Sequence, residues 1–229
     1  MGKLFDAALV LEYAPPIFLR FHVTLAIVAA SVVGGTLLGL LLTAAQLHRT
    51  PGLSLAAAGY ISFVRGTPVI IQMFIVYYGL PLALYRVGIN INRWNKLYFV
   101  LIAYALNNAA FMAEIIRSAV LSVPKGQSEA AWSVGLSGFQ AFRRIVLPQA
   151  FLTALPALGT RLVNTFHDTS LAFTLGILDM LGQAQAIGVR TYHVLEGYVF
   201  AALVFVAVSL LLEKGFTRAE AAFGRGVKK

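Results

Sequence analysis

The run VTLAIVAASVVGGTLLGLLLTAA, residues 23–45, decides the fold class of this chain. It contains no charged residue and exceeds the roughly 20 residues that an α-helix needs to cross a bilayer. Of the 229 residues, 59% are hydrophobic and only 12% are charged, and the mean hydropathy is +0.80. Soluble proteins carry about a quarter charged residues. The sequence therefore predicts an all-α, polytopic membrane protein with a single transmembrane domain, residues 1–229.

The remaining apolar segments are separated by charged or helix-breaking residues. Four further spans are expected, at residues 69–85, 97–120, 148–178 and 197–212. The polar sequence HDTS at 167–170 interrupts the fourth segment, which is therefore expected to be a broken span. Residues 53–64 are only moderately apolar and end at Arg65, which favours a helix lying in the membrane surface. Pro68 is suited to open the next span, because proline has no amide hydrogen to lose in the first turn.

The distribution of charge predicts an orientation. Five spans put the two termini on opposite sides of the membrane. The tail, residues 213–229, and the polar loop, residues 123–148, are rich in basic residues, which favours a cytoplasmic C-terminus and an N-terminus outside. The N-terminal segment, residues 1–20, lacks the charged, apolar and small-residue order of a cleavable signal peptide, so we expect it to remain on the mature protein.

The net charge of +9 does not indicate nucleic-acid binding. The basic residues stand singly or in pairs between apolar spans and form no stripe interleaved with aromatic residues. The chain has no cysteine, and its four histidines are scattered without ligand spacing. We therefore expect neither a metal site nor a nucleic-acid partner.

The polar loop, residues 123–148, carries local signals for two short helices joined by a glycine. Ser128 is suited to cap a helix from Glu129 to Val134, and Gly135 to the left-handed position that ends it. Ser137 and Gln140 form the capping-box pattern of a second helix that runs up to Pro148. The loop holds too many apolar residues to face only water. It therefore packs either on its own bundle or on another protein.

The order Glu129-Ala130-Ala131, then Gly135, then Ile145-Val146-Leu147-Pro148 resembles the EAA loop of ABC-importer permeases. Other stretches are similar to the polar amino-acid branch of that family, the histidine, glutamine, arginine and cystine type, and the resemblance covers nearly the whole chain. His167 departs from the family, which more often has lysine before Asp-Thr-Ser. The matching stretches are Arg65-Gly66-Thr67-Pro68, Gln72, Tyr77-Tyr78-Gly79-Leu80-Pro81, Ala113-Glu114-Ile115-Ile116-Arg117, Pro124-Lys125-Gly126-Gln127, Arg143-Arg144, Pro148-Gln149-Ala150 and Asp168-Thr169-Ser170-Leu171.

The resemblance implies a permease of the bacterial cytoplasmic (inner) membrane that moves a polar amino acid by alternating access. In this family the EAA loop docks onto a cytoplasmic ATPase, so the resemblance makes four residues candidates for ATPase coupling: Glu129, Ala130, Ala131 and Gly135. The simpler interpretation of Glu129 is a favourable charge near its own helix N-terminus.

The same resemblance implies the partners. They are a dimer of ABC ATPase subunits, a second permease subunit that is identical or paralogous, and an extracytoplasmic substrate-binding protein. No Gly-Lys-Ser or Gly-Lys-Thr ending a glycine-rich run occurs in the chain. We therefore expect that this chain is not an enzyme and binds no cofactor, and that ATP and Mg bind to the ATPase partner.

Polar side chains within spans are costly in lipid and are expected to face the bundle interior or an aqueous path. Asp168 is suited to bind the ammonium group of an amino acid, and Arg161 its carboxylate. Equally, Asp168 is suited to cap a helix that starts at Thr169. The candidates for the substrate path are Asp168, His167, Asn164, Thr169, Ser170, Gln72 and Arg161.

Four other residues are assigned structural roles. Glu114 and Arg117 stand three residues apart on one helix face and are expected to form an ion pair. Arg65 is expected to anchor the chain at a membrane surface, and Pro68 to open a helix.

Two other classes of protein remain to be weighed. An ion-coupled secondary transporter or channel for small polar solutes is the main alternative, but such transporters usually show two related halves, and no internal repeat is visible here. An intramembrane enzyme would need a converging set of catalytic groups, which the sequence does not suggest. The sequence leaves the identity of the amino acid open.

Overall fold

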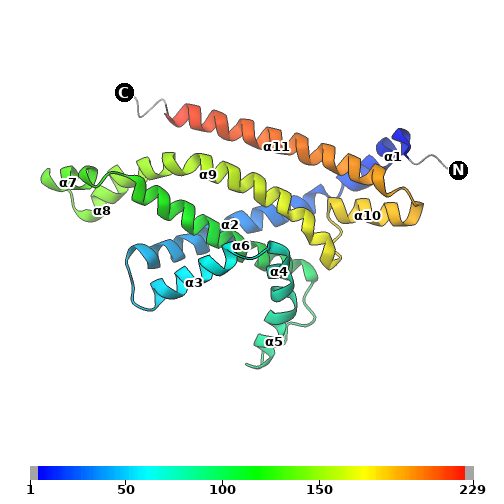
Figure 1. Ribbon diagram of the computed structural model, residues 1–229, viewed down its shortest axis with the longest axis horizontal. Helices are drawn as coiled ribbons and strands as arrows, with labels where there is room; N and C mark the ends of the chain where they lie inside the picture. Colours follow the sequence, from blue (N-terminus) through cyan, green and yellow to red (C-terminus); the bar gives the residue numbers. More distant parts are fainter. Residues whose placement is uncertain (1–4, 225–229) are drawn as a thin grey trace.

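The computed structural model describes residues 5–224, and every regular element in that range is helical (Figure 1). Four helical segments are long and apolar enough to cross a membrane, and a bent helix pair makes a fifth if it is counted as one span. The prediction of an all-α membrane protein with about five spans is therefore confirmed. The four long segments are α2 (Phe21–Leu47), α6 (Lys96–Ser122), Gly138–Leu175 and α11 (Val194–Gly224).

Helices α2 and α6 make the most extensive contact in the bundle, and small residues let their backbones approach. A Cβ added to Gly35 would lie 2.6 Å from the Cβ of Asn108, and one added to Gly39 would lie 2.8 Å from the Cβ of Met112. Ser31 Oγ donates a hydrogen bond of 2.9 Å across this contact, to the carbonyl oxygen of Tyr104. Small residues and interhelical hydrogen bonds are the usual means of helix association in lipid.

The fourth span is continuous, so the predicted break at residues 167–170 is wrong. It consists of α8 (Gly138–Ala141), a π-helical turn η2 (Phe142–Val146), α9 (Leu147–Asp168) and a 3₁₀ segment η3 (Thr169–Leu175). After Asp168 the helix changes from α-helical to 3₁₀ winding without a break. The Asp168 side chain makes no capping hydrogen bond, so the capping interpretation is also wrong.

The sequence suggested that a helix ends before Pro148, but in the structure the helix continues through this residue. Pro148 lies in the first turn of α9, immediately after the wide π-helical turn η2. In an α-helix a proline ring collides with the carbonyl group four residues earlier and removes one hydrogen bond. A π-helical turn lengthens the hydrogen-bond spacing to five residues at this point, which accommodates the ring.

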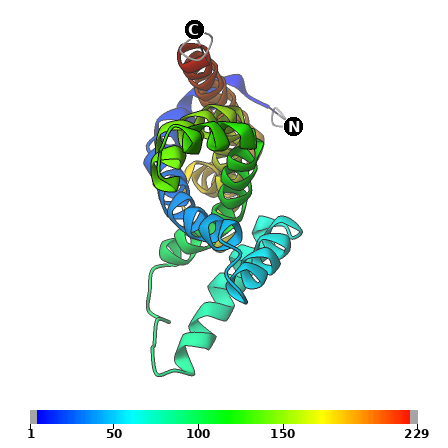
Figure 2. The same cartoon turned by 90° about the vertical axis from the view of Figure 1, so that its left-hand side faces the viewer.

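The second predicted span is divided differently from the prediction. Residues 53–64 belong to α3 (Leu53–Arg65), which packs along α2 and α6 and buries Ala57, Ile61 and Val64. At Pro68 the chain turns by 115° into an arm of α4 (Val69–Phe74), η1 (Ile75–Gly79) and α5 (Leu80–Tyr85), which points away from the bundle (Figure 2). Pro68 directly precedes α4, so its predicted role in opening a helix is confirmed.

Two further helices, α1 (Ala7–Phe18) and α10 (Met180–Thr191), were not predicted and lie at one end of the molecule (Figure 1). Tyr13 and Ile17 of α1 pack with Met180 and Ala184 of α10 in one buried cluster. Helix α11 is longer than the predicted residues 197–212, because Glu213 and Lys214 continue the helix. The remainder of the predicted tail, residues 225–229, lies outside the described residues, as do residues 1–4.

The α2–α6 contact generates a prediction about stability. Replacement of Gly35→Ala forces a Cβ against Asn108, and overpacking of this kind costs about 1–3 kcal/mol. We expect a lower midpoint of thermal unfolding in detergent. Gly59→Ala on α3 is the control, since a Cβ there meets nothing within 4 Å and alanine favours a helix. Equal midpoints for the two variants would contradict the packing described.

Candidate coupling loop and polar cavity

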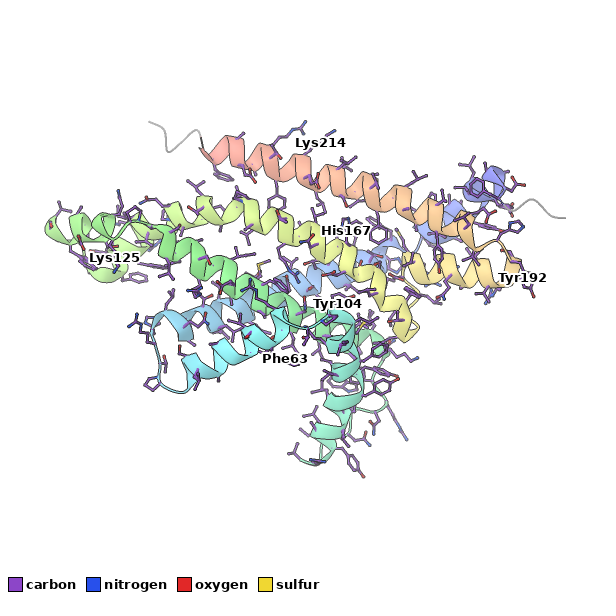
Figure 3. The ribbon with its side chains drawn as sticks, in the orientation of Figure 1. Phe63, Tyr104, Lys125, His167, Tyr192 and Lys214 are labelled. Carbon is purple, nitrogen blue, oxygen red and sulfur yellow. The ribbon has the colours of Figure 1, made fainter. Side chains whose placement is uncertain are left out.

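The loop of residues 123–148, here called the coupling loop, forms a helical hairpin at the end of the molecule opposite α10. Lys125 marks this end, and Tyr192 marks the other (Figure 3). Its first helix, α7 (Lys125–Ser133), starts directly after Pro124, so the predicted cap by Ser128 is wrong. The prediction for Gly135 is confirmed, since its φ of +84° lies in the left-handed region.

The second half of the hairpin agrees with its capping pattern. Ser137 Oγ accepts from the backbone N–H of Gln140 at 3.3 Å, and Gln140 Oε1 accepts from the backbone N–H of Ser137 at 2.9 Å. Each side chain therefore satisfies a backbone donor that the start of the helix leaves free. The turn between α7 and α8 is fixed by this capping box together with Gly135.

The coupling loop presents apolar side chains to its surroundings. Trp132 is 55% exposed, Val134 77% and Phe139 73%. Of the predicted coupling residues, Ala131 is buried inside the hairpin, whereas Glu129 and Ala130 are exposed. The Glu129 carboxylate has no ion-pair or hydrogen-bond partner within residues 5–224. A large exposed apolar patch with an unpaired charge is typical of a protein-binding surface.

A polar cavity of about 330 Å³ opens between α4, α6 and α9. Arg161 of α9 is its main charged group. The Arg161 side chain is 8% exposed, and its Nε and Nη2 donate hydrogen bonds of 2.6 Å to the Oδ1 atoms of Asn108 and Asn107. Its guanidinium also lies over the ring of Phe111, 3.9 Å from the ring centroid. These contacts compensate part of the cost of burying a charge.

The remaining edge of the guanidinium faces Asp168. Arg161 Nη1 lies 3.9 Å from Asp168 Oδ2, which is within reach of an ion pair but too far for a hydrogen bond. The backbone carbonyl of Asp168 accepts a hydrogen bond from the hydroxyl of Tyr104. The cavity therefore presents a cation and an anion side by side, each with free hydrogen-bonding capacity.

A chain of amides connects this cavity to the bend before α4. Asn107 Nδ2 donates to Gln72 Oε1 at 2.9 Å, and Gln72 Nε2 donates to Val64 O at 2.7 Å and to Thr67 Oγ1 at 2.8 Å. Gln72 thereby satisfies a carbonyl oxygen freed where α3 ends. The bend of 115° and the polar cavity are held by one hydrogen-bond network.

The structure brings together most of the predicted substrate-path residues, but not all of them. Asp168, His167, Asn164 and Arg161 line the cavity, and Gln72 reaches it through Asn107. His167 also makes a contact of 2.7 Å from Nε2 to Ser209 Oγ on α11. The other two do not line the cavity: Thr169 is buried and donates to Phe166 O, and Ser170 lies beyond it on η3.

Four residues that line the cavity were absent from the predicted set: Thr67, Val69, Asn107 and Phe111. Phe111 was missed because a phenylalanine within an apolar span gives no polar signal. Its spacing from Asn107 and Glu114, four and three residues, is the signal that places the three on one face of α6.

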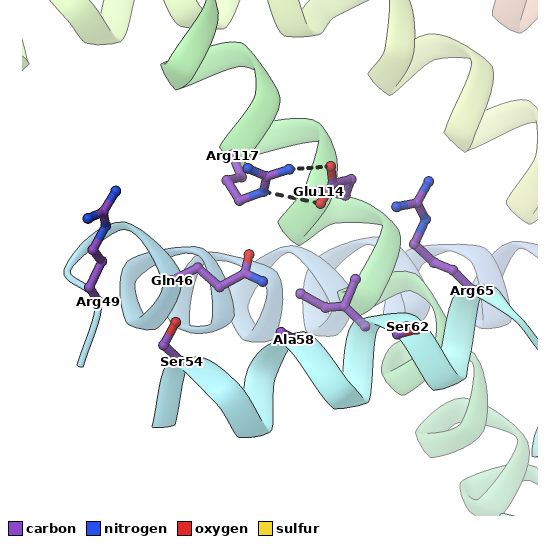
Figure 4. Close-up of a pocket in the computed structure, with 9 residues that line it drawn as sticks. Gln46, Arg49, Ser54, Ala58, Ser62, Arg65, Glu114 and Arg117 are labelled. Atoms are coloured by element: carbon purple, nitrogen blue, oxygen red, sulfur yellow. Dashed lines mark hydrogen bonds and ion pairs between the residues drawn. The ribbon is translucent and has the colours of Figure 1, made fainter. Parts of the chain in front are cut away.

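The predicted pair of Glu114 and Arg117 is confirmed. Arg117 Nη2 donates to Glu114 Oε1 at 2.6 Å, and Arg117 Nε donates to Glu114 Oε2 at 3.2 Å. The pair faces a second cavity, of about 700 Å³, that also contains Arg49 and Arg65 (Figure 4). Arg65 is exposed at the end of α3 and lines this cavity.

A bundle of long apolar helices with a polar cavity and an exposed helical hairpin at one end is the arrangement expected of a membrane transport subunit. Residues 35–219 match the model of the family described as the inner membrane component of binding-protein-dependent transport systems. The chain belongs to this family. The family assignment agrees with a permease role and with the inner membrane.

Individual relatives match over nearly their full length. The chain is 44% identical to the L-cystine transport system permease protein TcyL of Bacillus subtilis, over 96% of this chain and 92% of the relative. It is 34% identical to the nopaline transport system permease protein NocM of Agrobacterium fabrum, over 91% and 88%. The crystal structure of an amino acid ABC transporter with histidines superposes with a TM-score of 0.80 and 29% identity, over 96% of this chain and 98% of that chain.

The two hydrogen bonds that Arg161 donates to Asn107 and Asn108, here called the asparagine clamp, generate a prediction about stability. Replacement of Arg161→Lys removes the fork that meets both asparagines, and leaving a buried acceptor unpaired costs about 1–3 kcal/mol. We expect a midpoint of thermal unfolding several degrees lower. The exposed Arg190 of α10 provides the control, because Arg190→Lys should leave the midpoint unchanged. A shift of the same size in both variants would exclude the asparagine clamp as a stabilising element.

Proposed function

We propose that this chain is a permease subunit of an ATP-driven importer of a polar amino acid, with Arg161 and Asp168 in its substrate path. The observation that carries the proposal is a pair of opposite charges, the buried Arg161 and the partly exposed Asp168, 3.9 Å apart in a cavity beside Asn107 at the middle of α6. An amino acid carries a carboxylate and an ammonium group at a short, fixed separation. Arg161 Nη1 is free to bind the carboxylate and Asp168 the ammonium.

The relatives support an amino acid as the substrate. Those named above carry the names of L-cystine and nopaline systems, and the superposed structure is that of an amino acid transporter. The size of the polar cavity, about 330 Å³, is at the lower end of the range for small-molecule sites. Asn164, His167 and Thr67 on its walls are positioned to contact the substrate side chain.

The coupling loop is the proposed contact with a cytoplasmic ABC ATPase. Glu129 and Ala130 are exposed on α7, the buried Ala131 allows α7 to pack closely within the hairpin, and Gly135 sets the turn. The hairpin continues without interruption into α9, which carries Arg161 and Asp168. Movement of the hairpin by the ATPase would therefore be transmitted along one rigid helix to the substrate path.

This assignment fixes the proposed orientation. The end with the coupling loop is cytoplasmic, which places the C-terminus inside and the N-terminus, with α1 and α10, outside. Exposed Arg49, Lys125, Arg143 and Arg144 at the coupling-loop end support this orientation by the positive-inside rule. An extracytoplasmic substrate-binding protein would meet the opposite end, and a second permease subunit, identical or paralogous, would complete the path. ATP and Mg²⁺ would bind only to the ATPase partner.

Uptake into proteoliposomes that contain the whole transporter tests the proposal. We expect labelled amino acid to accumulate only with ATP, and Asp168→Asn to raise the KM about tenfold, because a lost charge-assisted contact of about 1.4 kcal/mol corresponds to that factor. Glu213→Gln, on the exposed part of α11, is the control and should leave KM unchanged. Accumulation without ATP, or driven by an ion gradient, would instead favour a secondary transporter.

The coupling role has its own test in ATP hydrolysis. Alanine in a left-handed position costs about 1 kcal/mol, so Gly135→Ala should distort the hairpin turn and reduce substrate-stimulated ATPase activity. Gly135→Asn should be milder, because asparagine tolerates this conformation. Gly126→Ala is the matched control on α7, where an added Cβ meets nothing within 4 Å. Identical activity of Gly126→Ala and Gly135→Ala would argue against coupling through this turn.

A further inference from the structure

The second cavity, here called the arginine groove, runs along the contact between α3 and α6 (Figure 4). On α3 it is lined by Ser54, Ser62 and Arg65, which lie on one helix face. On α6 it is lined by Glu114 and Arg117. Because Ser54 and Arg65 stand eleven residues apart on α3, the groups on this helix spread over about 17 Å along its axis at 1.5 Å per residue.

The arginine groove carries a positive charge. Glu114 is already paired with Arg117, whereas Arg49 and Arg65 have no ion-pair partner within residues 5–224. Its charged lining therefore consists of three arginines and one glutamate, a net charge of +2. Arg49 adopts a φ of +51° at the end of α2, a position that normally favours glycine.

One aromatic side chain lies between the groove and the polar cavity. Phe111 lines the polar cavity under Arg161, and Arg65 of the groove lies 6.0 Å from the centroid of the same ring. Along α6, Asn107 faces the polar cavity and Glu114 faces the groove, with Phe111 between them on the same face. Phe111 is therefore an apolar interruption in an otherwise polar stripe.

We propose that the arginine groove is the exit half of the substrate path and that Phe111 closes it from the polar cavity. This inference rests on the proposed function. A substrate carboxylate that leaves Arg161 would meet Arg65, then Arg117, then Arg49. The substrate class is an amino acid of neutral or negative net charge, because a groove whose lining carries a net charge of +2 repels a cationic amino acid.

The natural absence of cysteine makes the groove accessible to a direct test. The single variant Ser62→Cys would be labelled with membrane-impermeant thiosulfonates of charge −1 and +1, in inside-out vesicles that contain the whole transporter. We expect the anionic reagent to react on the order of tenfold faster, after correction for reaction with a free thiol, and the difference to fall with salt. An unreactive thiol, or a preference for the cationic reagent, would overturn the proposal.

The closing role of Phe111 is tested with Val69→Cys, which places a thiol at a half-buried position of α4 that lines the polar cavity. The thiol should be protected with Phe111 present, partly exposed with Phe111→Leu, and labelled at least tenfold faster with Phe111→Ala. Phe63→Ala, which removes an exposed ring from α3, is the matched control and should leave the protection unchanged. Labelling that does not depend on residue 111 would overturn the gate.

These measurements separate the two proposals. Labelling requires no transport. If the expected labelling pattern appeared in a protein that shows no ATP-driven uptake, amino-acid import would be rejected and the arginine groove would stand. ATP-driven uptake with equal labelling by both reagents would reject the arginine groove alone.

Discussion

The buried guanidinium of Arg161 is the constraint on which the interior of this protein depends. A cation at 8% exposure inside a helical bundle must be surrounded by acceptors, and these come from Asn107 and Asn108 of α6. Asn108 in turn donates to the carbonyl oxygen of Ser31 on α2, and Asn107 to Gln72 on α4. One side chain therefore connects four helices. The same network supports the sharp bend before α4 and leaves Arg161 Nη1 directed toward Asp168.

One continuous helix connects the polar cavity to the coupling loop. The helix that begins in the hairpin at Gly138 extends past Asp168 without a break. A displacement of the hairpin would therefore move Arg161 and Asp168 as part of the same element, relative to the asparagines of α6. In this arrangement one helix carries the exposed apolar surface of the hairpin at one end and the charges of the cavity, Arg161 and Asp168, near the other.

Much of the fold was predictable because hydrophobicity and capping act locally. The bounds of α2 and α6, the left-handed Gly135 and the capping box of Ser137 all follow from short sequence patterns. The predicted cap at Ser128 was wrong because the helix already starts at Lys125. The predicted helix end at Pro148 was wrong because a π-helical turn accommodates the proline, which a local pattern does not reveal. Helices α1 and α10 were missed because they are short and stabilised mainly by packing on each other and on α11.

The candidate site was predictable in its residues but not in its connections. Arg161 and Asp168 stand out because charge within a span is costly. Their partners could not be inferred, since Asn107 and Asn108 lie more than 50 residues away and nothing local pairs them with Arg161. The polar sequence around Asp168 was interpreted as a helix break, whereas its carboxylate faces an arginine two turns earlier on a continuous helix. Phe111 became significant only through its two neighbouring guanidinium groups.

The most direct measurement is an electron cryo-microscopy map of the assembled transporter with its amino acid bound. We expect ligand density within hydrogen-bond distance of Arg161 Nη1 and the Asp168 carboxylate, and an ATPase subunit in contact with the Glu129 face of the hairpin. Ligand density away from both side chains, with Arg161 still clamped by the asparagines and closed against Asp168, would contradict a substrate path through this cavity.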